Sequence, residues 1–392
     1  MRFADVCHQE RAISIIRRAL SSGRTHHAYL FDGPEGVGKR TAAMALVGRL
    51  LCESSGLAAD ADACGDCPSC RLVASNNHPD FHPIHRGLHT LHPDPSVRRS
   101  KGLFLAVDVV RHFLIACAGL KPSRGRARVF LIREAERMND GAQNALLKTL
   151  EEPPGASRLI LLTTAASRLL ATIRSRCQIV SFGPLPPGFV EQRLQAETKM
   201  TAETAHMFSR LCDGRLGAAL RWHRLDLEST LSEVASCLGR LENRDITEFG
   251  KGLIETAESL ARRMIESQKT EEPQRDELPL GAANNRKRPT RAKAPKTAAS
   301  KAVPTDDFRA AMKLVLMLIA AVYRDALIME SKGSSALTTL PERYALANGV
   351  DPESCIRAVA EAETMLDRNV NNQLLCEHLA ARLSGSIISA AP

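Results

Sequence analysis

The sequence predicts an α/β module, built on a parallel sheet with helices on both faces, followed by a small helical lid and an all-α C-terminal domain. In the first half of the chain, short apolar runs alternate with helical stretches, as in a parallel sheet covered by helices. A glycine-rich loop of the phosphate-binding type follows the first apolar run. From about residue 189 to the end, the chain has helical periodicity and no convincing strand.

Five short runs are expected to form the strands of the sheet. Their sequences are AYLFD, DFHPIH, RVFLI, RLILLTT and QIVSF, at residues 28–32, 80–85, 128–132, 158–164 and 178–182. The stretch GPLPPG closes this part of the chain, because prolines interrupt a strand.

The expected organisation is a module over residues 1–185, a lid over 186–228 and a helical domain over 229–392. Within the last domain, residues 306–328 begin with acids, which suits a helix N-terminus. The middle of that helix is apolar nearly all round, which predicts burial between other helices or subunits. Residues 268–305 are expected to be a disordered insertion.

Size and composition limit the classes of protein. A chain of 392 residues is too long for one ordinary core. Aromatic residues make up only 4%, which disfavours broad stacking platforms for single-stranded nucleic acid. No run reaches the roughly 18 apolar residues of a membrane span, and the first residues lack the apolar core of a signal peptide. We therefore expect a cytoplasmic protein with no membrane partner, whose 11 cysteines serve as thiols or metal ligands rather than disulfides.

The net charge of +9 is concentrated in one segment. Residues 286–301, RKRPTRAKAPKTAASK, contain seven Lys or Arg and no acid, so the rest of the chain carries only about +2 (9 − 7). A segment of this composition cannot bury enough apolar surface to order itself. It is either a solvated linker or a transient contact for DNA or a partner.

The loop GPEGVGKRT fits the pattern G-x-x-x-x-G-K between a strand and a helix. Its glycines let backbone N–H groups face phosphates, and the lysine can reach the β and γ phosphates. The next position should carry a Ser or Thr hydroxyl for Mg²⁺, but it is an arginine. The threonine follows one residue late, rotated by about 100° on a helix. The candidate nucleotide-binding residues of this degenerate loop are Gly33, Gly36, Gly38, Lys39, Arg40 and Thr41.

The third expected strand also lacks a magnesium ligand. P-loop ATPases place an aspartate directly after this strand, whereas this chain has Arg133, followed by Glu134. A unit charge about 4 Å away at an effective dielectric near 20 interacts by roughly 4 kcal/mol, and Mg²⁺ would double that repulsion. Arg133 either contacts phosphate directly or turns into solvent. Both positions that hold magnesium are therefore degraded together.

A cysteine cluster predicts a structural metal. Cys64, Cys67 and Cys70 are spaced as C-x₂-C-x₂-C, with Cys52 upstream, and glycine and proline between them let the chain curl. Four thiolates close a tetrahedral Zn²⁺ site, so we expect one structural zinc per chain in a module over residues 52–78. His78 is the alternative ligand if Cys52 faces the core.

The next segment, residues 82–103, contains histidines at 82, 85, 89 and 92. Their spacing is a weak metal signal, and a flexible surface insertion is expected.

Longer motifs resemble the clamp-loader family of AAA+ ATPases in bacterial DNA polymerase III. They are QNALLKTLEEPP (143–154), LLATIRSRCQ (169–178) and MLDRNVNNQLLCEHLAARL (365–383). By itself the first predicts a packing helix stopped by prolines. The resemblance implies that this helix lies at a subunit interface beside the SRC motif, residues 175–177. It also implies that Arg176 is an arginine finger, which points into the ATP site of the adjacent subunit and stabilises charge on the γ phosphate.

The same resemblance implies two nucleotide sensors. Thr163 or Thr164 resembles the polar sensor that faces the γ phosphate, although a buried threonine at a strand end is an equal explanation. In GRLGAAL the family's arginine is replaced by Gly217. The finger is therefore present, and the site behind it is expected not to be catalytic.

The expected function is that of a non-hydrolysing subunit of the DNA polymerase III clamp loader. The resemblance implies motor (tau/gamma-type) and delta-type partners in a hetero-pentameric ring, which loads the sliding clamp at primed DNA. Zinc is the expected cofactor, and occupancy of the loop by nucleotide is left open. The alternatives are an active AAA+ ATPase motor subunit with unusual magnesium ligands, and a DNA-binding adaptor that uses residues 286–301.

Overall fold

A computed structural model describes the chain as two compact units, one of Met1–Pro186 and one of the helices from Pro187 onward. The described residues are 2–54, 58, 60–100, 102–124, 126–242, 246–275, 304–331, 338–344, 351–368 and 370–388. The basic stretch 286–301 and most of the expected insertion lie outside them. The predicted fold class, a parallel sheet with helices on both faces followed by a helical region, is confirmed.

The first unit contains a five-stranded parallel sheet in the order β2-β3-β4-β1-β5. All five predicted strands are present, with ends that differ from the prediction by one residue at most. Their bounds are β1 Ala28–Asp32, β2 Phe81–Ile84, β3 Arg128–Ile132, β4 Ser157–Thr163 and β5 Gln178–Ser181.

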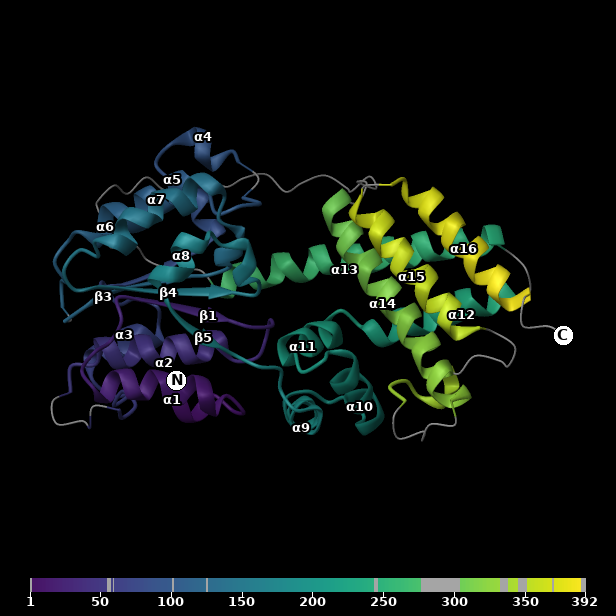
Figure 1. Cartoon of the computed structure of the whole chain (residues 1–392), viewed down its shortest axis with the longest axis horizontal. Helices are drawn as coiled ribbons and strands as arrows, with labels where there is room; N and C mark the ends of the chain where they lie inside the picture. The colour runs from purple at the N-terminus through teal and green to yellow at the C-terminus, as the bar shows by residue number, and fades with distance from the viewer. Residues whose placement is uncertain are drawn as a thin grey trace, which may run out of the picture. The chain divides into compact units, whose positions relative to one another are not determined.

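Helices cover both faces of this sheet (Figure 1). One face carries α1 (Glu10–Ser21), α2 (Lys39–Leu51) and α3 (Pro68–Ala74), and the other carries α5 (Val107–Val110) with its continuation to Ala118, α7 (Asp140–Glu151) and α8 (Ala171–Arg176). Alternate strand residues such as Leu30, Phe130 and Leu161 join the core under the second set. The apolar runs therefore serve two cores at once, as expected for strands buried on both faces.

Because all strands are parallel, the sheet has two chemically different edges. We call the edge where the strands begin the amino edge and the edge where they end the carboxyl edge. The phosphate loop follows β1 and so lies at the carboxyl edge, whereas Arg176 precedes β5 and lies at the amino edge. The candidate sites are distributed over these two edges.

Residues 82–103 do not form the loose insertion that the sequence suggested. After β2 they fold into the 3₁₀ helix Arg86–Leu91 and the helical turn α4 (Pro95–Arg98). Leu88 anchors this segment in the core, and His85 and His92 are buried. Leu88, together with Val97, packs on the core under this segment and holds it against the sheet.

The second unit is all helical, as predicted. Its helices are α9 (Pro187–Glu197), α10 (Ala202–Leu211), α11 (Leu216–Arg224), α12 (Leu227–Glu242), α13 (Ile246–Arg275), α14 (Thr305–Glu330), α15 (Pro352–Asp367) and α16 (Asn372–Ile388). Helix α13 continues into the first residues of the expected insertion. The apolar middle of α14 is buried where the helix packs against α13 and α15, as its composition predicts.

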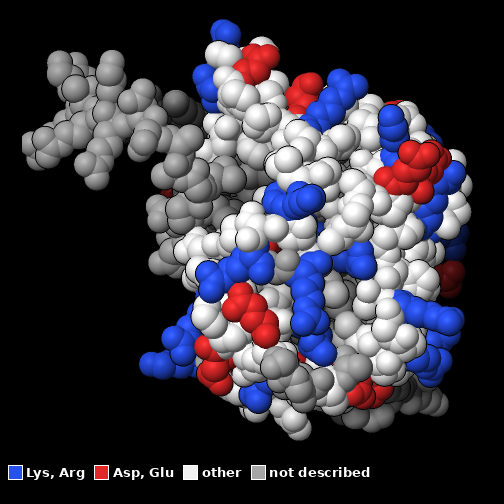
Figure 2. Space-filling view, turned by 90° about the vertical axis from the view of Figure 1, so that its left-hand side faces the viewer, with Lys and Arg blue, Asp and Glu red and all other residues white. Residues whose placement is uncertain are grey.

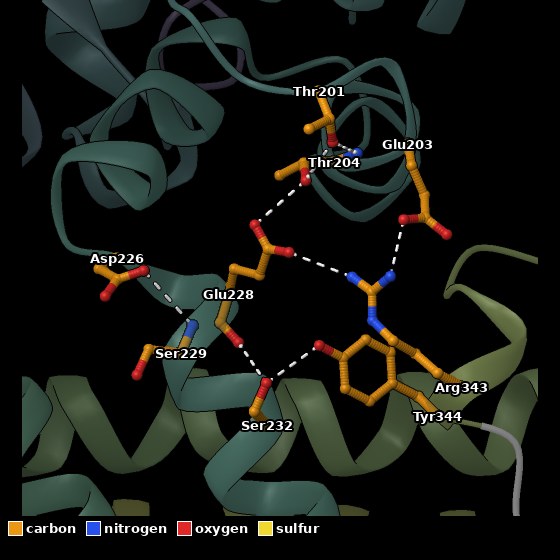
Figure 3. Close-up of polar contacts among 9 residues, drawn as sticks. All are labelled: Thr201, Glu203, Thr204, Asp226, Glu228, Ser229, Ser232, Arg343 and Tyr344. Atoms are coloured by element: carbon orange, nitrogen blue, oxygen red, sulfur yellow. Dashed lines mark hydrogen bonds and ion pairs between the residues drawn. The ribbon is translucent and has the colours of Figure 1, made fainter.

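Arg343 joins three segments of this unit (Figure 3). Its guanidinium pairs with Glu203 of α10 at 2.7 Å and with Glu228 of α12 at 3.1 Å. The next residue, Tyr344, hydrogen-bonds to Ser232 at 3.0 Å, and the guanidinium lies 5.0 Å from the centre of the tyrosine ring. A planar fork that binds two carboxylates fixes geometry better than a single exposed ion pair.

Arg343→Ala is therefore expected to lower the free energy of unfolding by about 1–2 kcal/mol, since a network exceeds an isolated surface pair. The matched control is Arg357→Ala, which removes one exposed helical pair with Glu353 at 3.0 Å and should cost only a few tenths of a kcal/mol. Urea titration of both variants measures the difference. Equal losses would mean that the Arg343 network adds nothing beyond a surface pair.

Candidate functional site

The phosphate loop has a backbone that only glycine can adopt at two positions. Gly33 has φ +150°, and a Cβ there would lie 2.3 Å from the carbonyl oxygen of Phe182. Gly38 has φ +102° and is the N-cap of α2, and its carbonyl accepts the N–H of Ala42 at 3.0 Å as the first hydrogen bond of that helix. The strand–loop–helix arrangement that the motif requires is therefore present.

Lys39, the lysine of the loop, is turned onto the loop itself. Its Nζ donates to the carbonyl oxygens of Gly33 and Pro34, the latter at 2.6 Å. Burial lowers the pKa of the amine, while the charges of Glu136, Asp32 and Glu35 act in the opposite direction. An ammonium in this position can meet a phosphate only after it leaves these carbonyls.

The two residues after Lys39 do not restore a magnesium ligand. Arg40 is exposed on the first turn of α2, and Thr41 is half-buried beside it. Arg133 is half-buried directly after β3, and its backbone N–H donates to Ile84 at 2.9 Å. The positions of the missing hydroxyl and carboxylate are thus occupied by arginines.

Glu134, the remaining acid of this segment, is held by arginines. It has φ +51°, and its carboxylate pairs with Arg86 at 3.0 Å and with Arg137 at 3.6 Å. A carboxylate engaged by two arginines is not oriented towards a water molecule at the phosphate loop.

Glu136 is a residue at this edge that the sequence analysis missed. One of its oxygens accepts a hydrogen bond from Thr164 at 2.7 Å. The other, Oε2, is buried and accepts none from any residue within the described ranges. The second sensor candidate, Thr163, is buried and accepts from the N–H of Ala165 at 3.1 Å. Of the nearby carboxylates, Glu136 raises the pKa of Lys39 most, ahead of Asp32 and Glu35.

Arg176 lies at the opposite edge of the sheet. It is the last residue of α8, and the neighbouring strand β1 needs five residues to reach the phosphate loop, roughly 16 Å at about 3.3 Å per residue. Its guanidinium pairs with Glu151 at 2.7 Å and donates to the carbonyl of Thr172 at 3.0 Å. Arg176 is therefore too far away to serve the phosphate loop of its own chain.

The surroundings of Arg176 are open and cationic. An open cavity of about 600 Å³ is lined by His26, His27, Leu150, Glu151, Ser175, Arg176, Cys177 and Gln178. Figure 2 views this end of the first unit, and Lys and Arg side chains are spread over it. Exposed cations from the segments before the strands are Arg24, Lys121 and Arg126, whereas Arg124 is paired with Glu53 at 2.8 Å. A surface of this charge favours an anionic partner.

The four predicted metal ligands come together. The Sγ atoms of Cys52, Cys64, Cys67 and Cys70 all lie within 4.8 Å of one another, and three of the pairs are 3.5, 3.8 and 4.0 Å apart. The backbone N–H groups of Cys67 and Cys70 each donate to the sulfur three residues earlier, at 3.4 Å. Hydrogen bonds, from Ser54 first, lower the pKa of the Cys64 thiol to about 6. This cluster can hold a metal ion.

His78 is not part of the cluster. Its Nε2 lies 2.9 Å from the Ser69 hydroxyl, and its Nδ1 accepts the N–H of Asp80 at 3.1 Å. Because both ring nitrogens have partners within the protein, neither is left for a metal. The histidines at 82, 85, 89 and 92 likewise do not converge with other potential ligands in the described part of the chain.

A polar network, buried at Asp80 and partly exposed at Glu53, connects the cysteine module to the amino edge. Glu53 accepts from Ser69 at 2.7 Å and from Arg124 at 2.8 Å. Asp80, fully buried, accepts the backbone N–H of Arg124 at 2.8 Å and pairs with Arg128 at 3.5 Å. The loop before β3 is thus fixed by groups that flank the cysteines.

His82 ends this network and gives it a pH dependence. Its ring stacks on Phe130 with centroids 4.9 Å apart, and its Nε2 lies 3.3 Å from Nη1 of Arg128. Burial, and then the charge of Arg128, lowers the pKa of His82 to about 4. A histidine with a lowered pKa in the folded protein stabilises it above the unfolded value near 6.5, and this stability is lost as the pH falls towards 4.

We therefore expect the free energy of unfolding to fall between pH 6.5 and 4, with about 2–3 kcal/mol of the loss due to His82. His82→Gln keeps a hydrogen-bond acceptor without a titrating ring and should flatten that part of the profile. The exposed His26→Gln is the control. Parallel profiles for all three proteins would exclude His82 as the cause.

Comparison with known proteins shows what the first unit is similar to. Residues 8–186 match the model of the family described as "DNA polymerase III, delta subunit". The delta' subunit of Bacillus subtilis is 34% identical over 187 residues, 47% of this chain and 51% of the relative. The delta' subunit of Pseudomonas aeruginosa is 35% identical over 225 residues, 56% and 62% respectively. The resemblance to clamp-loader proteins of DNA polymerase III that the sequence motifs indicate is confirmed, with delta' subunits among the matches.

The tau subunit of Salmonella typhimurium is 37% identical over 226 residues, which is 56% of this chain and 32% of that protein. The chain thus spans between about a third and two thirds of the length of these relatives. A DNA polymerase III gamma subunit-related protein from Thermotoga maritima aligns over 96% of this chain and 99% of its own, at a TM-score of 0.42 and 15% identity. No described helix combines the length and apolar character of a membrane span.

Proposed function

We propose that this protein is a non-hydrolysing subunit of the DNA polymerase III clamp loader, which supplies Arg176 in trans to the ATP site of a neighbouring subunit. The position of Arg176 carries this proposal. It lies at the amino edge, about one strand length from its own phosphate loop, beside an open cavity and on a cationic surface. An arginine so placed suits a triphosphate presented by another chain.

The proposed absence of hydrolysis rests on the carboxyl edge. Arginines stand at both positions of the magnesium ligands, and Glu134 is paired with Arg86 and Arg137. Gly217, in α11 of the second unit, lacks the side chain of an arginine sensor. The loop can still bind a nucleotide, through its glycine backbone and Lys39, without being able to turn it over.

In this proposal the partners are motor (tau/gamma-type) and delta-type subunits, joined in a hetero-pentameric ring. Helices of residues 186–228 form a lid, and those of 229–392 form the collar that holds the ring together. Through the complex, the protein takes part in loading the sliding clamp at primed DNA in the cytoplasm. The buried middle of α14 is suited to such a helical collar.

We also propose that the cysteine cluster holds one structural zinc ion. Zinc–sulfur bonds of about 2.3 Å in a tetrahedron place the sulfurs about 3.8 Å apart. The three separations of 3.5, 3.8 and 4.0 Å fit that figure. Four thiolates leave no position for a catalytic water molecule, so the role is structural.

An active motor subunit is the second candidate function, favoured by the tau relatives and by the intact backbone of the phosphate loop. ATP turnover distinguishes the two. The isolated chain should have no activity above background, and Lys39→Ala should change nothing. The complex assembled with Arg176→Ala should form normally and hydrolyse ATP more slowly. If the isolated chain hydrolyses ATP and Lys39→Ala abolishes this activity, the result would favour the active motor subunit.

A further inference from the structure

The carboxylate that binds Arg176 comes from the end of another helix. Glu151 is the last residue of α7, and its Oε1 lies 2.7 Å from Nη2 of Arg176. The second contact is with the Thr172 carbonyl of the same helix, α8, which accepts a hydrogen bond from Nη1 of Arg176 at 3.0 Å. The guanidinium is thus fixed from two elements, α7 and α8.

These contacts leave part of the guanidinium free to act. They engage Nη1 and one side of Nη2, and a guanidinium carries further N–H donors. The side chains of Glu151 and Arg176 are 47% and 35% exposed, and both line the open cavity at the amino edge. A phosphate that enters the cavity can therefore meet a guanidinium whose orientation is already set.

Helix stability does not account for an acid at this position. The C-terminus of a helix carries partial negative charge from its free carbonyl groups, so a carboxylate there is unfavourable. Glu151 occupies the last turn of α7 nevertheless, and Glu152 follows it. Of the two, Glu151 has a cationic partner, whereas Glu152 is exposed and makes no ion pair among the described residues.

From this geometry we propose that Glu151 is a positioning residue for Arg176: it holds the guanidinium in the cavity before the neighbour's nucleotide arrives. The inference rests on the proposed function of Arg176 in trans. An exposed ion pair is weak, so the more highly charged triphosphate can share or displace Glu151. The ion pair contributes orientation. Because Glu151 restricts the Arg176 side chain before the nucleotide binds, this loss of side-chain freedom does not add to the barrier of the reaction.

The test uses the complex reconstituted with its motor and delta-type subunits, in which the phosphate loops of the other ATP sites are inactivated, with ATP turnover measured over a range of ATP concentrations. Glu151→Ala should lower kcat by about tenfold at the site that Arg176 serves, with KM within about twofold. Glu151→Gln retains an acceptor oxygen of the same reach and should recover part of the loss. Glu152→Ala, the matched control one residue away, should behave as wild type.

A second measurement reports on Arg176 in the isolated chain. Modification of Arg176 by phenylglyoxal, followed by peptide mass spectrometry, should be several-fold faster in Glu151→Ala and unchanged in Glu152→Ala. Thermal unfolding of each variant shows whether the chain is folded. If Glu151→Ala does not fold, the isosteric Glu151→Gln still provides the test.

The outcomes distinguish the positioning role of Glu151 from the function of Arg176 in trans. If Arg176→Ala slows turnover while Glu151→Ala and Glu151→Gln do not, the positioning role of Glu151 is wrong and the finger remains. If Arg176→Ala itself leaves turnover unchanged, the proposed function fails, and the role of Glu151 fails with it. Equal effects of Glu151→Ala and Glu152→Ala would indicate general surface charge instead of positioning.

Discussion

Replacing Arg176 by alanine is expected to slow ATP hydrolysis at one site of the assembled complex by about 10³-fold or more. An arginine finger acts on charge that develops on the γ phosphate, and its loss has that order of effect on kcat. The side chain is held at the surface by Glu151 and Thr172, so its removal leaves no cavity in the core. We therefore expect the fold and the assembly to be unchanged.

The size of the measured effect depends on how many sites contribute. Other ATP sites of the complex would use other fingers, so steady-state turnover falls only by the share of the affected site. The measurement is sharpest when the remaining sites carry inactive phosphate loops. Under that condition the full loss of rate is visible in a single-turnover experiment.

Two variants make the interpretation specific. Arg176→Lys keeps the charge but loses the planar guanidinium. Its rate should therefore exceed that of Arg176→Ala by less than about tenfold. Arg126→Ala removes an exposed cation from the same basic edge and should leave the rate unchanged. A similar loss in Arg126→Ala would show that the surface acts through its overall charge. Full activity of Arg176→Ala would remove the proposed function.

The strands were predictable because the physical signal is local. A strand buried on both faces must be apolar over its whole length, as RVFLI is, and such a run can be read without knowing its neighbours. The cysteine cluster was predictable for a similar reason, since three of its ligands lie within seven residues. The proximity of Cys52 follows from its place at the end of α2.

The partners of the charged residues were not predictable, because they are far apart in the sequence. Glu134 meets Arg86 from 48 residues away, and Glu136 meets Thr164 from 28 residues away. Sequence spacing placed Glu134 in the position of a catalytic acid, but only the fold reveals the arginine that holds it. Glu151 reads as part of a packing helix until α7 and α8 are placed side by side.

The network around Asp80 links the cysteine module to the loop before β3. Ser69 lies between Cys67 and Cys70, and its hydroxyl binds Glu53, which in turn binds Arg124 at the amino edge. If the module loosens, the partners of the loop before β3 are released together. We therefore expect a metal bound at the cysteines to stabilise a surface that lies outside the metal site.

Removing the metal is consequently the second large effect that we expect. Purified protein should contain one zinc ion per chain, and Cys64→Ser with Cys70→Ser should lose it. Binding of structural zinc to small peptides is worth about 10–16 kcal/mol, of which an already folded module loses only a part. We expect the free energy of unfolding to fall by several kcal/mol, measured by denaturant titration with and without a strong chelator.

The control is Cys7→Ser, because Cys7 is exposed and remote from the cluster in sequence. It should keep its zinc and its stability, which would show that the effect does not arise from thiol loss in general. The rate of proteolysis within residues 60–74 should rise in the double variant and not in the control, because α3 is too short to be stable alone. Protein that lacks zinc while all four thiols remain reduced, and that has unchanged stability, would contradict the assignment. In that case the four sulfurs would be an ordinary thiol cluster, and the network from Glu53 to Arg124 would have to hold the module without a metal.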